Sequence, residues 1–79
     1  MDMEKITTTA QKIRFAFEDF YGDKEKRVLF DALFNRYLSD VDPAGVMDPY
    51  DAIVSLGRQA PEEFDQMVNE MHEMKLLTD

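Results

Sequence analysis

The chain has 79 residues, no cysteine and a formal net charge of −8. This length allows one domain, residues 1–79, whose core nets roughly 3–5 kcal/mol, and without cysteine no disulfide can brace it. No apolar run approaches the roughly 20 residues of a membrane span. The N-terminal MDMEKITTT also lacks the apolar segment of a signal peptide. We therefore expect a cytoplasmic protein.

The negative charge is concentrated in the second half of the chain. Residues 1–38 carry seven acidic and seven basic residues, whereas residues 39–79 carry ten acidic residues and only Arg58 and Lys75 as bases. Such a chain repels phosphate backbones and offers no basic patch, so direct nucleic-acid binding is not expected. The pattern favours a basic surface on a partner protein. The alternative is that the acidic residues only maintain solubility.

The first half predicts two helices, over about 4–21 and 24–40. Between them, Gly22 suits a helix C-terminus with a positive φ, and Asp23 suits the N-cap of the second helix. A connection this short predicts an antiparallel hairpin. Apolar side chains fill an arc of roughly 180° on the second helix, so we expect two or three neighbours to cover it. The first helix has a narrower apolar stripe, formed by Ile6, Ala10, Ile13, Phe17, Phe20 and Tyr21.

The second half predicts two shorter helices after a loop. Val46 and Met47 of the loop are expected to turn inward. An Asp48-Pro49 start predicts a helix over 49–59, in which Gly57 marks either a close approach or the helix end. Pro61 then opens a helix over about 61–75. The whole pattern predicts a compact all-α four-helix domain, without repeats, linkers or a second domain.

The fourth predicted helix combines a methionine-rich apolar face with an acidic back. Its apolar stripe is formed by Phe64, Met67, Val68, Met71 and Met74. Methionine fills irregular cores, and it also lines promiscuous surfaces that bind helices. The face is therefore either part of the core or a helix-binding surface.

Phe15 is an exception on the first predicted helix. It projects about 180° away from the apolar stripe of that helix. Either the C-terminal Leu76-Leu77 covers it, or it anchors a partner or a second copy of the chain, which would make the protein a homodimer.

No pattern indicates catalysis. The only histidine, His72, lies at the edge of the fourth helix's apolar stripe, and Ser39 and Ser55 lack the context of a nucleophile. The three glycines are isolated, so they form no phosphate-binding loop. We expect no enzyme activity, no catalytic residue and no cofactor.

The loop between the second and third predicted helices is acidic. In DVDPAGVMDPYD, Asp40, Asp42, Gly45, Asp48 and Asp51 occupy positions 1, 3, 6, 9 and 12. With these residues the segment resembles a degenerate EF-hand, which implies a calcium site at the four aspartates. Ala44 stands where the fifth-position ligand is expected, and Asp51 is shorter than the usual glutamate. The alternative is that Asp42 and Asp48 cap and turn the backbone.

These patterns favour a small non-enzymatic protein that inhibits or modulates a partner by docking its acidic half on a basic, nucleic-acid-binding surface. Small phage-encoded nucleic-acid mimics, anti-CRISPR proteins among them, offer an analogy in size and charge. Phe15 or the methionine face would add the apolar contact that charge alone does not supply. The alternatives are the EF-hand-like or helix-binding module and the homodimer. The predicted partner-binding residues are Asp40, Asp42, Asp48, Asp51, Glu62, Glu63, Glu70, Glu73 and Phe15.

Overall fold

The computed structural model describes residues 3–77, and four α-helices account for most of them. They are α1 (Met3–Asp19), α2 (Lys24–Leu38), α3 (Pro49–Gln59) and α4 (Pro61–Glu73). Residues 3–77 contain no strand. The all-α four-helix prediction is confirmed, and α3 has its predicted bounds. The other three helices end two residues earlier than predicted.

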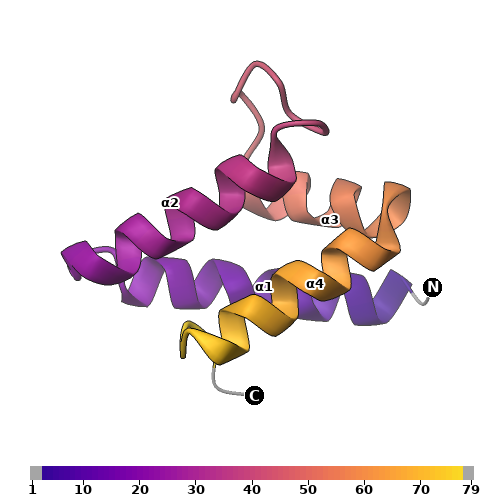
Figure 1. Cartoon of the computed structure of the whole chain (residues 1–79). Helices are drawn as coiled ribbons and strands as arrows, with labels where there is room; N and C mark the ends of the chain where they lie inside the picture. The colour runs from indigo at the N-terminus through magenta and orange to yellow at the C-terminus, as the bar shows by residue number, and fades with distance from the viewer. Residues whose placement is uncertain (1–2, 78–79) are drawn as a thin grey trace.

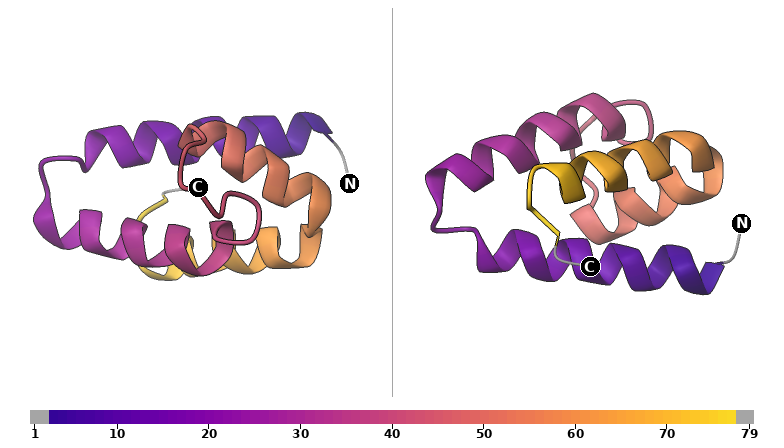
Figure 2. Two further views of the ribbon diagram at one scale, coloured as in Figure 1. Left: turned by 90° about the horizontal axis from the view of Figure 1, so that it is seen from above. Right: turned by 60° about the horizontal axis from the view of Figure 1, so that its bottom comes forward.

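The α1–α2 pair reverses direction as predicted, but it opens into a V. Figures 1 and 2 show the two helices diverging from their short connection, with α3 at the open end and α4 running back from it toward the closed end. At the closed end Phe17 packs on Phe30, with ring centres 5.5 Å apart. Helix α2 also packs against α3 and α4, so its predicted coverage by neighbours is confirmed. Helix α3 contacts all three other helices, and it contacts α1 and α4 more extensively than α2.

The core lies between the four helices and is apolar throughout. No polar or charged residue among 3–77 is buried. Burial of large apolar side chains is the main stabilising contribution in a domain of this size. The fully buried large side chains of the core are Ile6, Ile13, Phe30, Ile53, Leu56, Phe64, Met67, Met71 and Leu76. In the described part of the chain, no helix has both the length and the apolar character needed to cross a bilayer.

The connection between α1 and α2 differs from the prediction in two ways. Gly22 does not adopt a positive φ; instead, the amide of Asp23 donates to the carbonyl of Phe20 at 2.9 Å and closes a tight turn. Tyr21 is 55% exposed rather than part of the buried stripe, and the guanidinium carbon of Arg27 lies 4.2 Å from its ring centre. The Asp23 cap is confirmed, because its side chain accepts from the amide of Lys26.

Helix α4 ends early because the chain reverses at Lys75. This residue adopts a left-handed conformation, with φ 62°. The amide of Leu76 donates to the carbonyl of Met71 at 2.8 Å, and that of Lys75 donates to His72 at 3.1 Å. This is a Schellman motif, in which burial of Leu76 against the core accompanies the helix stop.

The loop before α3 turns only one of its two predicted side chains inward. Met47 packs against the core, whereas Val46 is 80% exposed. Gly45 takes the left-handed conformation in this loop, with φ 67°. The side-chain direction therefore changes between two consecutive residues of the turn.

Candidate functional site

The charge of the second half resides mainly on two elements. Helix α4 carries five acidic residues and no Lys or Arg, and the segment 39–48 carries three acidic residues and no base. Helix α1, in contrast, has three acidic and three basic residues. Figure 1 shows α4 along one side of the domain, while 39–48 projects beyond the end of α2. Apart from Asp51, which lies in the first turn of α3, the predicted acidic residues therefore form two groups on different elements rather than one surface.

The acidic residues of α4 occupy its solvent side. At 100° per residue, they span an arc of about 160° opposite the buried Phe64, Met67 and Met71. Four of them are exposed and make no hydrogen bond or ion pair within residues 3–77. We call these four residues the α4 acidic face: Glu62, Glu63, Asp65 and Glu73. All of them except Asp65 are among the predicted partner-binding residues.

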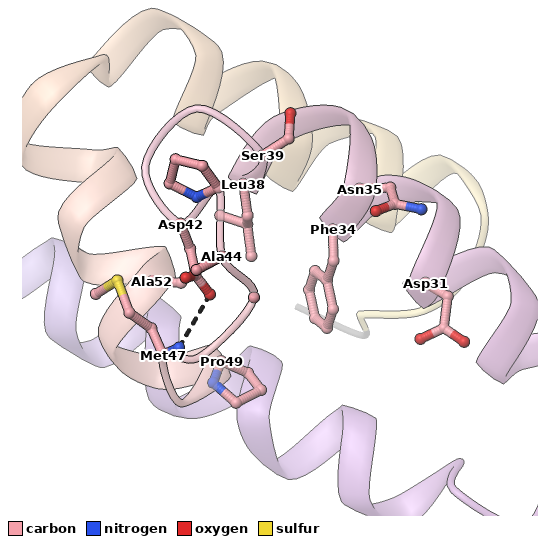
Figure 3. A pocket seen from close by; sticks show the side chains of 12 residues that line it. Asp31, Phe34, Asn35, Leu38, Ser39, Asp42, Ala44, Met47, Pro49 and Ala52 are labelled. Atoms are coloured by element: carbon pink, nitrogen blue, oxygen red, sulfur yellow. Dashed lines mark hydrogen bonds between the residues drawn. The ribbon is translucent and has the colours of Figure 1, made fainter.

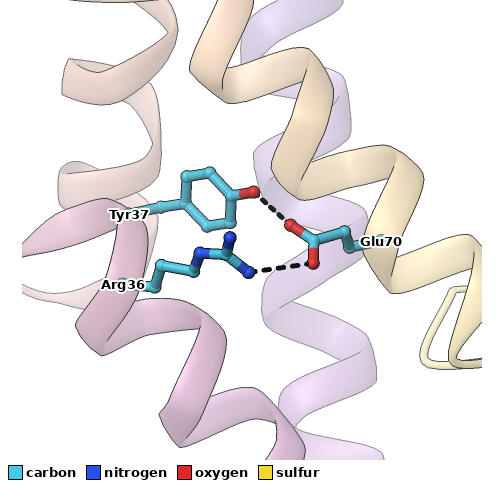
Figure 4. Close-up of polar contacts among 3 residues, drawn as sticks. All are labelled: Arg36, Tyr37 and Glu70. Carbon is cyan, nitrogen blue, oxygen red and sulfur yellow. Dashed lines mark hydrogen bonds and ion pairs between the residues drawn. The ribbon is translucent and has the colours of Figure 1, made fainter.

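Glu70 differs from the α4 acidic face because it has partners inside the molecule. Figure 4 shows its carboxylate between Arg36 and Tyr37 of α2. Nη1 of Arg36 donates to Oε1 at 3.3 Å, and the hydroxyl of Tyr37 donates to Oε2. The two bonds join α2 to α4, so this carboxylate is occupied by its own fold.

The bond to Glu70 changes the titration of Tyr37. The Glu70 carboxylate, which accepts the phenol proton, raises the pKa of Tyr37 above its ordinary 10.0. Burial raises this pKa further, while the Arg36 charge lowers it. The raised pKa stabilises the fold below about pH 10, and this contribution is lost as pH rises through the folded-state pKa.

We therefore expect the free energy of unfolding to fall with pH more steeply in the native chain than in Tyr37→Phe. Urea titrations between about pH 8 and about pH 11.5 measure this slope. Tyr21→Phe, which removes an exposed phenol without such a bond, should keep the native slope. An unchanged slope in Tyr37→Phe would show that the Glu70 bond does not couple to folding.

Two of the four aspartates of the 40–51 segment, Asp42 and Asp48, accept hydrogen bonds from the backbone. Both carboxylate oxygens of Asp42 accept amides, from Val46 and Met47, each at 3.0 Å, and Figure 3 shows the second of these bonds. The side chain of Asp48 accepts from the amide of Tyr50 and caps α3. Asp42 therefore stabilises the turn and Asp48 caps α3, which is the predicted alternative to a role as calcium ligands.

The geometry does not support the EF-hand resemblance. Within residues 3–77, no group of three or more His, Cys, Asp or Glu side chains could hold a metal ion. The structure therefore does not gather Asp40, Asp42, Asp48 and Asp51 into a cation site. Asp40 and Asp51 are exposed and have no hydrogen bond or ion pair in the described chain.

An apolar hollow of about 520 Å³ lies beside the acidic loop. It lies between α2 and residues 42–52, as Figure 3 shows. Phe34, Leu38 and Met47 contribute its apolar wall, and Asp31 and Ser39 are exposed residues that also line it. No sequence pattern indicates this hollow, because its lining residues extend over 21 positions, from 31 to 52, and meet only in the fold.

Of the two predicted apolar anchors, the methionine face of α4 is buried and Phe15 is exposed. The methionine face of α4 is core, since Met67 and Met71 are fully buried, so it offers no helix-binding surface. Phe15 is 65% exposed, so the interpretation that Leu76 and Leu77 cover it is wrong. Leu76 and Leu77 line a groove next to it without burying it.

The other candidate residues do not converge. His72 is exposed at the edge of that groove, Ser39 is exposed, and Ser55 is half-buried on α3. No family model matches the chain, and no curated protein or solved structure matches it.

Proposed function

We propose that the chain is a non-enzymatic, cytoplasmic binding protein that docks the α4 acidic face on a basic surface of a partner protein. One observation carries the proposal: four exposed carboxylates follow the solvent side of one helix, which has no Lys or Arg, and none of the four has a hydrogen-bond or ion-pair partner within residues 3–77.

The position of the charges along α4 favours an external cation. Glu62 lies in the first turn, where the helix dipole stabilises a carboxylate. Glu73 is the last residue of α4, where the negative end of the helix dipole repels a carboxylate. Like charges on neighbouring turns also destabilise the isolated helix slightly. A basic partner surface would relieve both repulsions.

A nucleic-acid-binding surface is the partner chemistry that fits best. Such surfaces present Arg and Lys spaced to meet rows of anions, and carboxylates on successive helical turns offer a comparable row. The protein would then inhibit by competing with nucleic acid. Electrostatic matching of this kind accelerates association and is screened by salt.

Affinity capture from a lysate of the native host tests this proposal with two matched variants. The first, Glu62→Gln/Asp65→Asn/Glu73→Gln, neutralises part of the α4 acidic face. The second, Glu18→Gln/Glu25→Gln/Asp31→Asn, neutralises three acids of the first two helices. Both change the net charge from −8 to −5.

We expect the native chain and the second variant to capture the same basic protein, and the first variant to lose it. Added duplex DNA and roughly 0.5 M salt, where the Debye length is only a few ångströms, should release it. Equal capture by both variants would contradict the proposal. Loss in both would assign the binding to net charge rather than to α4.

A further inference from the structure

The outward face of α1 combines an exposed aromatic ring with balanced charges. Lys5, Thr8, Lys12, Phe15 and Asp19 lie within an arc of about 80° on this helix, and all five are exposed. Helix α1 has equal numbers of acidic and basic residues, unlike α4. It is therefore a face on which two chains with a net charge of −8 can approach with little repulsion.

A groove of about 560 Å³ runs beside this face. Thr9 and Ala16 of α1 line it on one side, and Val68 of α4 with Leu76 and Leu77 line it on the other. Phe15 belongs to the α1 edge of the groove, and its 65% exposure shows that its own chain leaves most of the residue uncovered. The same face therefore presents an apolar protrusion and an apolar hollow.

The face is complementary to itself when inverted. In an antiparallel pair of α1 helices with a two-fold axis at Lys12, residues equally distant from Lys12 in opposite directions face each other. Lys5 and Asp19 are each seven residues from Lys12, on opposite sides of it along the helix. Lys5 then faces the partner's Asp19. Phe15 faces the region of the partner's Thr8, because the two residues lie only about 20° apart around the helix.

We propose that the protein forms a two-fold dimer in which the α1 helices pack antiparallel. Each Phe15 packs against the partner's α1 beside Thr8, and Lys5 pairs with the partner's Asp19 at both ends of the contact. Within residues 3–77, neither Lys5 nor Asp19 makes a hydrogen bond or ion pair. Repulsion between the two Lys12 ammonium groups at the axis is of order 1 kcal/mol or less in water, because both are exposed.

This geometry favours a second copy of the chain over a lipid surface or a charged partner. Lys5 and Asp19 lie at opposite ends of the face with opposite charges, and a two-fold axis at Lys12 matches each with its complement. A uniformly basic or acidic partner would be repelled at one end. The proposal does not depend on the function assigned to α4, which lies across the groove.

Sedimentation velocity measures the dimer dissociation constant. The chain concentration should range from about 1 µM to about 1 mM, because interfaces of modest size associate in this range. Phe15→Ser should raise the dimer dissociation constant at least thirtyfold or so, as expected for a central aromatic anchor. Tyr21→Ser, which removes another exposed aromatic ring but one outside the face, should leave the constant unchanged. Circular dichroism checks that every variant remains folded.

A charge exchange tests the register. Lys5→Asp and Asp19→Lys should each weaken the dimer, and the double variant should restore it, because it has the native net charge and the reversed pairs. Asp19→Lys is the decisive single change, since it lowers the net negative charge and would strengthen any dimer limited by general repulsion. A native chain that stays monomeric, a Phe15→Ser dimer, or a double variant that fails to recover would each overturn the proposal.

Discussion

Replacing Phe30 by alanine is expected to unfold most of the protein. Phe30 is fully buried, and its ring lies 5.5 Å from that of Phe17 and 5.8 Å from that of Phe34. Truncating a buried phenylalanine costs about 3–5 kcal/mol, which is comparable to the whole stability of a core this small. Because these rings hold the closed end of the α1–α2 pair, their loss also frees the angle between the helices.

Thermal unfolding followed by far-ultraviolet circular dichroism measures this effect. We expect Phe30→Ala to lack a cooperative transition at 25 °C or above. Val28→Ala is the matched control on the same helix, because Val28 is 60% exposed, and its stability should stay within about 0.5 kcal/mol of the native value. A Phe30→Ala chain that melts within a few degrees of the native chain would show that the aromatic cluster is not central to the core.

The helix starts could be read from the sequence because their signals are local. Asp48 caps α3 with its own side chain and Pro49 occupies the first turn, so every determinant lies within three residues. Helix ends were less predictable. The apolar period extends through Phe20 and Tyr21, but packing of Phe20 against Phe30 across the turn ends α1 earlier. Lys75 takes a conformation that local preference assigns to glycine, because burial of Leu76 requires it.

The candidate site also has features that the sequence predicts and features that only the fold determines. Composition located the acidic charge on the second half, and helical periodicity located most of the α4 acidic face. Neither could show that Glu70 is bound by Arg36 and Tyr37, residues more than thirty positions away. Nor could a pattern show that Phe15 is exposed while the methionine face is buried. Both outcomes depend on which elements the fold brings together.

The two proposed interfaces would reinforce each other. A dimer through α1 leaves the acidic solvent side of α4 available on both protomers, so one assembly presents two acidic surfaces related by a two-fold axis. A partner with paired basic sites would then bind the dimer more tightly than the monomer, because the second contact is intramolecular. Phe15→Ser would reduce that affinity without touching an acidic residue, which separates avidity from direct contact.

Replacing Gly57 by leucine is expected to cost about 3 kcal/mol or more, through overpacking of a site with no free space. A Cβ added at Gly57 would lie 2.8 Å from Cγ2 of Ile6, which is buried on α1. Ile6 is β-branched and stiff at χ1, so it cannot rotate away cheaply. Helices α1 and α3 would have to separate, which exposes the core that they share. Urea denaturation measures the loss, and Gly22→Leu is the control of equal size, because nothing lies within 4 Å of a Cβ there.

A double-mutant cycle shows whether Ile6 is the obstacle. Alone, Ile6→Ala should cost about 2–5 kcal/mol as a cavity-forming change. On that background Gly57→Ala should become stabilising, by up to about 1 kcal/mol, because the clash is gone while alanine favours the helix over glycine. In the native background the same Gly57→Ala change should destabilise. If its effect has the same sign in both backgrounds, the close approach of α1 and α3 at Gly57 does not limit the packing.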